Sequence, residues 1–445
     1  MILFHLKLAL ISLRSTPRVS LISVLAIALG IAVATSMTSI HYVFAQNPLP
    51  EKSDVLYNVR IDTWDPNSEF FAVPPGEPPK AVTYQDMAGM MESDIPRHQT
   101  GVADASVYVF PADDLNKPYQ TTVQLVHADF FPMFNVPFRY GSGWADDADR
   151  TREAVTVLSQ AANDKLFGGR DSVGELVRLG TREFTVIGVL DPYQPTPKFY
   201  DVVNSLAGAT NEFFVPFDLI REQDLGFSVT GNTDGWGDNA TFVGDLIFTT
   251  AEWYWIQFWV EVDPIRHAEY TSFVDDYSLK LKDLGRYPRP LNNRVTLMMD
   301  WVSERNQTGG TTTVIMMLSM LFLAVCAINL TGLLLGKFLA KANRIGIYRA
   351  LGAPRRSVFM QHLIECELVG LLGGGIGILL AMLTLRLIVR MMPNLQGFVS
   401  SGIFSLNGTM IAVAIALALV AGLCAGIYPA WRASRISPAM QINIA

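Results

Sequence analysis

Four long apolar runs are the feature that most constrains this chain. They cover roughly residues 19–45, 313–336, 363–389 and 408–428, and a helix needs about 20 residues to cross a bilayer. Of all residues, 50% are hydrophobic and only 17% are charged, whereas soluble proteins carry about 25% charged residues. The sequence therefore predicts a membrane protein with four transmembrane α-helices.

A polar block, residues 47–310, separates the first apolar run from the second and is long enough for a large domain. Strand-like and helix-like patterns alternate in it without a clean linker, which predicts a large mixed α/β domain of two intertwined subdomains. The expected strands lie in residues 54–62, 153–159, 183–190 and 252–262, and the expected helices in residues 159–169 and 267–285.

Charge predicts the orientation. Residues 1–18, the loop after the second run and the C-terminal tail carry basic residues and no acid. By the positive-inside rule these regions face the cytoplasm, so both termini are inside and the polar block is outside. The block holds 21 of the 34 basic and 39 of the 41 acidic residues, a formal charge of −18. An acidic outer domain argues against nucleic acid as a partner.

These patterns divide the chain into four parts. Residues 1–18 are expected to form an amphipathic helix at the inner membrane interface, which turns at Pro17 into the first transmembrane helix, residues 19–46. Residues 47–310 form the outer domain. Residues 311–445 form a domain of three membrane spans with a cytoplasmic hairpin at residues 340–360.

Small residues recur four positions apart in the apolar runs. This spacing lets helices approach closely, so we expect tight helix packing within or between chains. The residues concerned are Gly30, Ala34, Gly332, Gly336, Gly373, Gly377, Gly422 and Gly426.

The chain shows no catalytic or metal-binding pattern of its own. The nearest string to a phosphate-binding loop, residues 332–337, is one residue too short and is followed by Phe338 instead of Ser or Thr. The six histidines are scattered, and the three cysteines all lie in or beside the spans. We therefore expect no enzyme activity, catalytic residue, metal or cofactor in this chain.

The basic hairpin is more elaborate than a connection between two spans requires. Its first arm is a short helix in which Ile345, Tyr348 and Leu351 are spaced for one face, and a Gly-Ala-Pro break follows. Such a hairpin suits docking into a groove of another protein; the alternative is attraction to anionic lipid. Glu365 and Glu367 follow the hairpin. They either occupy the N-terminal end of a helix, where negative charge is favourable, or pair with basic groups of the hairpin or of a partner.

The same stretch resembles the signature of MacB/FtsX-type permeases of ABC transporters. The matching strings are "NRIGIYRALGAPRRSVF" and "LIECELVGLLGGGIGILLA". A third string, "GIYPAWRASRISPAMQI", resembles the closing motif of the family, the last one along its sequence. In the polar block, residues 129–144 and 155–190 resemble the family's periplasmic core domain.

The resemblance implies a permease of the bacterial inner membrane that dimerises and binds a separate cytoplasmic ATPase, which holds ATP and magnesium. Motion of the ATPase on the cytoplasmic side would be transmitted mechanically through the membrane (mechanotransmission) and act on a periplasmic or outer-leaflet substrate, such as a drug or peptide. An assembly with a periplasmic adaptor and an outer-membrane channel is left open, and membrane lipid is a further partner. The residues assigned to ATPase coupling are Arg344, Ile345, Gly346, Ile347, Arg349, Ala350, Leu351, Gly352, Arg355, Arg356 and Glu365.

The hairpin departs from the family pattern at one position. Members usually carry Arg-Glu before Ile-Gly, whereas this chain has Asn343 and Arg344. We therefore hypothesise pairing with a second, different permease that keeps the acid, with a homodimer as the alternative. Two alternative functions stay open: a signalling scaffold that activates a periplasmic cell-wall enzyme, and a permease that releases lipoproteins.

Overall fold

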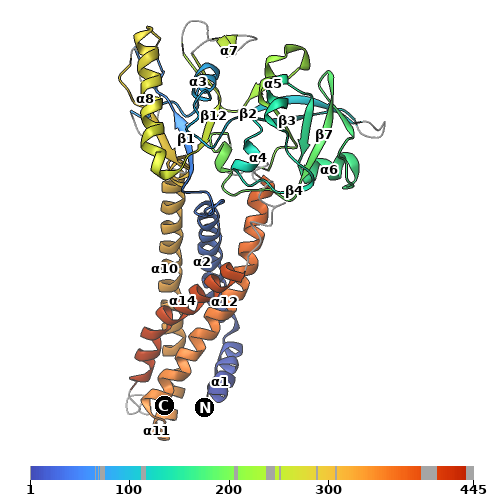
Figure 1. Ribbon diagram of the computed structural model, residues 1–445. Coiled ribbons are helices and arrows are strands. Elements are labelled where there is room, and N and C mark those ends of the chain that lie inside the picture. The colour runs from blue at the N-terminus through green and yellow to red at the C-terminus, as the bar shows by residue number, and fades with distance from the viewer. Residues whose placement is uncertain are drawn as a thin grey trace. The chain divides into compact units, whose positions relative to one another are not determined.

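The computed structural model divides the chain into two compact units, which are described separately (Figure 1). Residues 1–45 and 307–445 form a helical unit, and residues 46–306 form a sheet unit. The structure describes residues 2–65, 67–68, 70, 76–111, 117–204, 209–236, 246–249, 252–286, 289–305, 308–391 and 408–436.

The helical unit consists of long apolar helices and two short helices that precede or join them. Its helices are α1 (Ile2–Ser15), α2 (Pro17–Phe44), α10 (Thr308–Ala340), α11 (Ala342–Ala350), α12 (Arg355–Met391) and α14 (Gly408–Ser434). In the described part of the chain, α2, α10, α12 and α14 are the four helices long and apolar enough to cross a membrane. The four predicted transmembrane helices, with a mixed α/β domain between the first and second, are confirmed.

Helix α1, the helix expected at residues 1–18, has a buried side and an exposed side. His5 and Ala9 are buried and Leu13 packs on the helical core, whereas Leu10 is exposed. Pro17 begins α2, as expected, because proline fits the first helical turn.

Several of the predicted small residues lie where helices meet. A methyl group added at Gly373 of α12 would lie 2.0 Å from Cγ2 of Ile27 in α2, and one at Gly30 would lie 3.0 Å from Cβ of Cys326 in α10. Other such contacts join Gly377 to Ala28 and Ile31, Gly426 to Cys366, and Gly422 to the Glu367 carboxylate, and Ala34 is fully buried. Gly332 and Gly336 are exposed, with nothing within 4 Å of an added methyl group. They make no helix contact within the described chain, and their packing against a second chain stays a prediction.

A matched pair of glycines in α12 tests this packing. We expect Gly373→Ala to destabilise the helical unit by about 1–3 kcal/mol, because the added methyl overpacks the contact with Ile27. Gly375 is exposed and has open space around it, so Gly375→Ala should instead stabilise by up to about 1 kcal/mol through helix propensity. Thermal unfolding of the two variants in detergent measures the difference, and equal effects would contradict the close α2–α12 contact.

The sheet unit is built on an eleven-stranded sheet, counted over the described residues. Its strands are β1 (Leu56–Arg60), β2 (His98–Phe110), β3 (Tyr119–Val126), β4 (Phe138–Gly141), β5 (Val155–Leu158), β6 (Leu176–Leu179), β7 (Arg182–Leu190), β8 (Phe213–Pro216), β9 (Ser228–Thr230), β12 (Gln257–Glu261) and β13 (Arg294–Leu297). The order is β13-β1-β12-β2-β3-β8-β5-β7-β4, and β6 pairs with both β2 and β7. The pairings β2-β3-β8-β5-β7-β6-β2 therefore close a ring.

The long strand β2 joins this ring to the open part of the sheet. Its first residues pair with β12 and its last residues with β6, while β3 runs along its other edge. Alternate residues of β2, from Ala103 to Val109, are buried in the larger core. A second, aromatic-rich core includes Phe130, Phe134 and Trp259. The strand expected at residues 252–262 is divided in the structure into the two-residue strand β11 (Trp253–Tyr254) and β12, and all five residues of β12 are buried.

Short helices complete the sheet unit. They are α3 (Tyr84–Met90), α4 (Phe130–Met133), α5 (Asp146–Thr151), α6 (Gln160–Phe167), α7 (Leu246–Thr249), α8 (His267–Asp283) and α9 (Met298–Arg305). The two helices predicted from sequence are α6 and α8. In α6 the Ser159 side chain accepts a hydrogen bond from the Ala162 amide, and Gly168 ends the helix in the left-handed conformation. The division into two subdomains stays a prediction.

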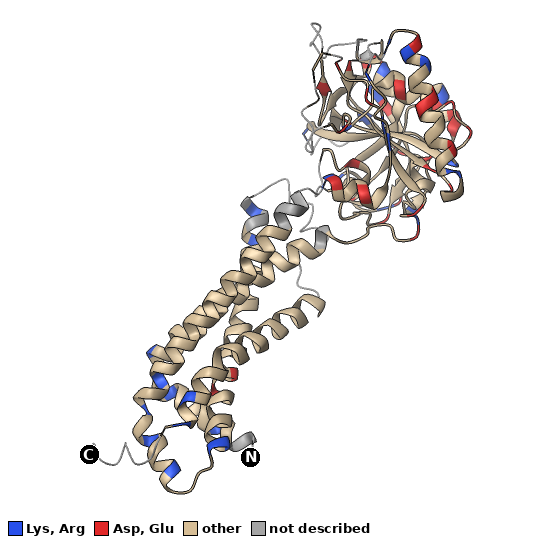
Figure 2. Cartoon of the chain, turned by 90° about the vertical axis from the view of Figure 1, so that its left-hand side faces the viewer, with Lys and Arg blue, Asp and Glu red and all other residues tan. Residues whose placement is uncertain are grey.

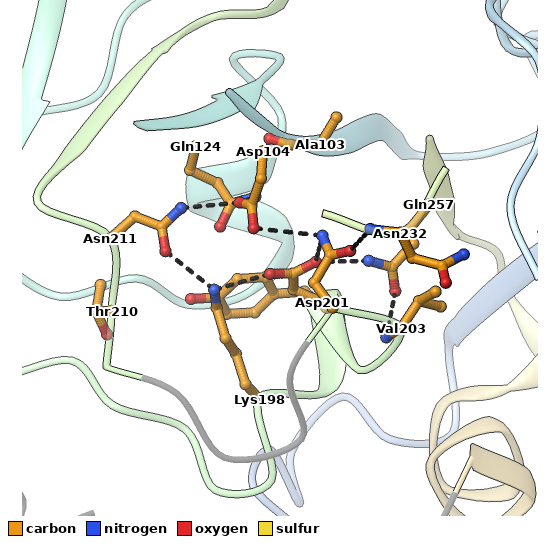
Figure 3. A network of polar contacts seen from close by, with 12 residues as sticks. Ala103, Asp104, Gln124, Lys198, Asp201, Val203, Thr210, Asn211, Asn232 and Gln257 are labelled. Carbon is orange, nitrogen blue, oxygen red and sulfur yellow. Dashed lines mark hydrogen bonds and ion pairs between the residues drawn. The ribbon is translucent and has the colours of Figure 1, made fainter. Parts of the chain in front are cut away.

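A polar network is buried in the sheet unit (Figure 3). Lys198 Nζ lies 2.8 Å from Oδ2 of Asp201 and 3.1 Å from Oδ1 of Asn211. Asp104 of β2 accepts hydrogen bonds from Gln124 and Asn211, each at 2.9 Å. The network thus fastens the segment around Lys198 to the middle of the sheet.

Candidate functional site

Basic residues gather at one end of the helical unit, the end that carries α1 and α11 (Figure 2). We call it the basic end. Lys7, Arg14, Arg18, Lys337, Lys341, Arg344, Arg349, Arg355, Arg356, Arg432 and Arg435 lie in its helices and turns. The acidic residues of the four spans are Glu365 and Glu367 of α12. This end contains most of the residues assigned from sequence to ATPase coupling.

The predicted hairpin is present as α11, a tight turn and the start of α12. Gly352 has φ +97°, a left-handed conformation that glycine adopts without strain. The Gly352 amide donates to the Arg349 carbonyl and the Ala353 amide to the Tyr348 carbonyl, both at 3.1 Å. Pro354 then precedes α12. Glycine and proline therefore set the reversal of the chain here.

Ile345, Tyr348 and Leu351, which the sequence spaces for one face of the first arm, lie in different environments in the structure. Ile345 is buried in the core of the helical unit. Tyr348 is 55% exposed and Leu351 is 81% exposed, and the neighbouring Ile347 is also exposed. The helix is thus held on one side and presents an apolar tip on the other.

Of the other residues assigned to ATPase coupling, some are exposed and some are buried or contact other parts of the helical unit. Arg344, Ala350, Gly352, Arg355 and Arg356 are exposed, and Gly346 is buried. Arg349 donates a hydrogen bond to the carbonyl of Ile436, which follows α14. The closing motif of the chain therefore contacts α11, although residues 437–442 of that motif lie outside the described residues.

Glu365 lies inside the helical unit. Its side chain is fully buried and forms an ion pair with Lys337 of α10, with Nζ 2.7 Å from Oε1. Ser12 of α1 donates to the same oxygen at 2.6 Å, and Lys337 also donates to Ser20 of α2 at 3.2 Å. His362 Nδ1 is 3.5 Å from Oε2. Glu365 therefore joins helices rather than presenting a carboxylate to a partner.

For Glu365 this arrangement differs from both sequence interpretations, a role at a helix N-terminus and a pairing with the hairpin or a partner, whereas pairing of Glu367 with a partner stays a prediction. Glu365 is ten residues into α12, too deep to act at the helix N-terminus, and its ion-pair partner is on α10. The Glu367 carboxylate lies beside Gly422 of α14 and has no hydrogen-bond partner among the described residues.

Lys341 links the hairpin to this ion pair. It follows α10 directly, and its Nζ donates to Ser12 Oγ and to Ser15 Oγ, both at 2.9 Å. Burial lowers the pKa of Lys341 below its ordinary value. A continuous set of polar contacts thus runs from the hairpin through Ser12 to Glu365 and Lys337. Sequence analysis missed Ser12, Ser20 and His362, although a lysine and a glutamate within apolar spans are themselves a signal of paired charges.

The fold defines a class: a four-span membrane protein with a large sheet unit inserted between the first and second spans and a basic hairpin between the second and third. The family model of the MacB-like periplasmic core domain matches residues 20–264, and that of the FtsX-like permease C-terminal domain matches residues 316–438. The chain therefore belongs to the MacB/FtsX-like family of ABC-transporter permeases. The match and the apolar helices indicate an inner-membrane protein with a periplasmic domain.

Curated relatives support the same family. The macrolide export ATP-binding/permease protein MacB of Hahella chejuensis is 23% identical over 332 residues, 73% of this chain and 43% of the relative. MacB of Azoarcus sp. is 24% identical over 351 residues, 79% of this chain and 46% of the relative. The chain thus spans less than half the length of these relatives.

Two solved structures are similar to part of this chain at low identity. The extracellular domain of the noncanonic ABC-type transporter YknZ from Gram-positive bacteria is 15% identical, with a TM-score of 0.34, over 54% of this chain and 99% of that chain. The periplasmic region of MacB from Actinobacillus actinomycetemcomitans is 13% identical, with a TM-score of 0.35, over 57% of this chain and 94% of that chain.

Proposed function

We propose that this chain is the permease subunit of a mechanotransmission-type ABC transporter that acts on a periplasmic or outer-leaflet substrate. A separate ATPase, which binds ATP and magnesium, docks on α11 at the cytoplasmic side, so the basic end and both termini face the cytoplasm. Permeases of this family work with ATPase partners. The relatives are named for macrolide export, and export of a drug or peptide is the corresponding proposal here.

One observation carries this proposal: α11 exposes an apolar tip next to basic side chains. Tyr348 and Leu351 are exposed, whereas Ile345 anchors the same helix in the core. A short helix with one side fixed and an apolar side free suits insertion into a groove of a partner protein. Leu351 is the most exposed of these apolar residues and is our choice as the main contact.

The contacts behind α11 support a route for the motion. A push on the hairpin would move Lys341, which is tied to Ser12 of α1 and through it to the Glu365–Lys337 ion pair. That pair joins α10 to α12. The motion of a docked ATPase would therefore reach the spans through polar contacts whose rupture leaves buried charges unpaired.

The proposed transporter contains two permeases. Arg344 places a base where relatives usually carry an acid, and we propose that a second, different permease supplies the acid. Purification of this chain only as a homodimer with full ATPase coupling would contradict that assignment. A periplasmic adaptor and an outer-membrane channel are further proposed partners.

Leu351→Asp tests the docking surface. We expect the amount of ATPase that copurifies with the tagged chain from its native membrane, measured by mass spectrometry, to fall at least about tenfold, because a charge replaces an apolar contact in the groove. Leu284→Asp is the matched control, since Leu284 is 74% exposed at the end of α8 in the sheet unit.

Any outcome other than a loss of the ATPase in Leu351→Asp alone contradicts part of the proposal. Full retention of the ATPase by Leu351→Asp would remove α11 as its docking site. Equal losses in both variants would point to misfolding rather than to docking. Recovery of a cell-wall enzyme in place of transport partners would favour the signalling scaffold, and recovery of lipoproteins would favour the lipoprotein-releasing permease.

A further inference from the structure

A cavity of about 300 Å³ lies between α1, α11 and the first turns of α12. One wall comes from α1, with Leu8, Ile11 and Ser12, and another from α11 and the residue before it, with Lys341 and Arg344. The third wall includes Ser357 of α12. All three walls belong to the helical unit.

The charged side chains that line this cavity are basic. Among the described residues, its lining includes Lys341 and Arg344 and no aspartate or glutamate. Arg344 is exposed and has no ion pair or hydrogen bond with any other described residue. In the described part of the chain, Lys341 donates hydrogen bonds only to oxygens of Ser12 and Ser15, and burial lowers its pKa. An anion in the cavity would supply both cations with a partner.

The cavity also has an apolar side at the level where the spans end. Leu8, Ile11, Ile345 and Val358 line it, and Ile11 is itself half exposed. The candidate span of α10 ends at Ala340, one residue before Lys341, and that of α12 begins at Arg355. Cations and apolar side chains therefore meet at the depth where lipid headgroups join their acyl chains.

We propose that this cavity binds one anionic phospholipid, with its phosphate between Lys341 and Arg344 and the start of an acyl chain along Leu8 and Ile11. The fork of Arg344 suits bidentate contact with phosphate oxygens. The lipid then lies against Ser12, which binds Glu365, so the site borders the contacts that join α1, α10 and α12. This inference does not depend on the ATPase or on the substrate.

The test compares lipid retention by the full-length purified chain. The protein is incubated with phosphatidylglycerol and phosphatidylcholine of the same acyl chains, and bound lipids are counted by native mass spectrometry. We expect preference for phosphatidylglycerol, and an about fivefold loss of that lipid in Arg344→Gln, the effect of one basic residue near an anionic headgroup. Arg356→Gln is the matched control, because Arg356 is an exposed arginine of the same end that does not line the cavity.

A second variant tests the space rather than the charge. Ser357→Leu fills the cavity without removing a cation and should also lower phosphatidylglycerol retention. Equal losses in Arg344→Gln and Arg356→Gln would overturn the proposal in favour of diffuse attraction to the basic end. Arg344-dependent binding of soluble glycerol phosphate, with no selective retention of phosphatidylglycerol, would overturn the lipid assignment and leave a site for a free phosphate compound.

Discussion

Lys337→Met is expected to destabilise the helical unit by about 3–5 kcal/mol, because it leaves the carboxylate of Glu365 buried without its cation. The Lys337 and Glu365 side chains are 1% and 0% exposed, so water cannot replace the missing charge. Ser12 still donates to Glu365, but one neutral hydroxyl cannot balance a full charge in this environment. The loss of the folded chromatographic peak on heating, in detergent, measures the effect.

Two further variants show whether the cost comes from the unpaired charge. Lys337→Met combined with Glu365→Gln should recover most of the stability, since neither buried group is then charged. Arg356→Met removes an exposed cation of the same end and should change stability by less than about 1 kcal/mol. If the double variant is as unstable as Lys337→Met, the Lys337 side chain contributes mainly through packing, and the ion pair is not the link between α10 and α12.

The sequence predicts this unit well wherever one local pattern decides the structure. Apolar length predicts the four spans, Pro17 predicts the start of α2, and Gly352 predicts the reversal after α11. Each of these depends on a residue and its near neighbours. The family motifs add the order of the parts, and the family matches confirm that assignment.

The polar contacts behind the hairpin could not be predicted in the same way. Lys337, Glu365 and Ser12 come from three helices, and their distances depend on how those helices pack. In sequence Lys337 is one more basic residue that predicts orientation, and only its burial shows that it has a specific partner. The same limit applies to Gly332, because spacing predicts a close helix contact but does not say which face has a neighbour.

Lys198→Met is expected to destabilise the sheet unit by about 3–5 kcal/mol at pH 8, because two buried carboxylates lose their shared cation. Lys198 contacts Asp201 at 2.8 Å and lies near Asp104 in the same network (Figure 3). Lys165→Met is the matched control: Lys165 pairs with Glu212 at 3.0 Å but is 45% exposed, so its removal should cost less than about 1 kcal/mol. Tryptophan fluorescence during thermal unfolding is a suitable readout, since seven of the eight tryptophans lie in residues 46–306.

The loss of stability caused by Lys198→Met, measured as the decrease in the free energy of unfolding, should also depend on pH. Burial, reinforced by Asp201, raises the pKa of Asp104 from 3.8 to about 7. The unfolded chain therefore releases this proton at lower pH than the folded chain, and the free energy of unfolding falls as pH rises from about 4 to about 7. Lys198 opposes the shift by lowering the pKa of Asp104. Without Lys198 the fall continues to higher pH, so the deficit of the variant is small near pH 4 and largest near pH 8.

Titratable groups of the sheet unit outside this network contribute equally to the pH dependence of unfolding in the wild-type chain and in Lys198→Met. Burial also raises the pKa of Asp149 to about 7, and its share of the fall is present with or without Lys198. The difference between the two unfolding curves therefore isolates the network around Asp104. A deficit of the same size at pH 4 and pH 8 would mean that Lys198 stabilises the sheet unit by filling space, and not by balancing the charge of Asp104 and Asp201.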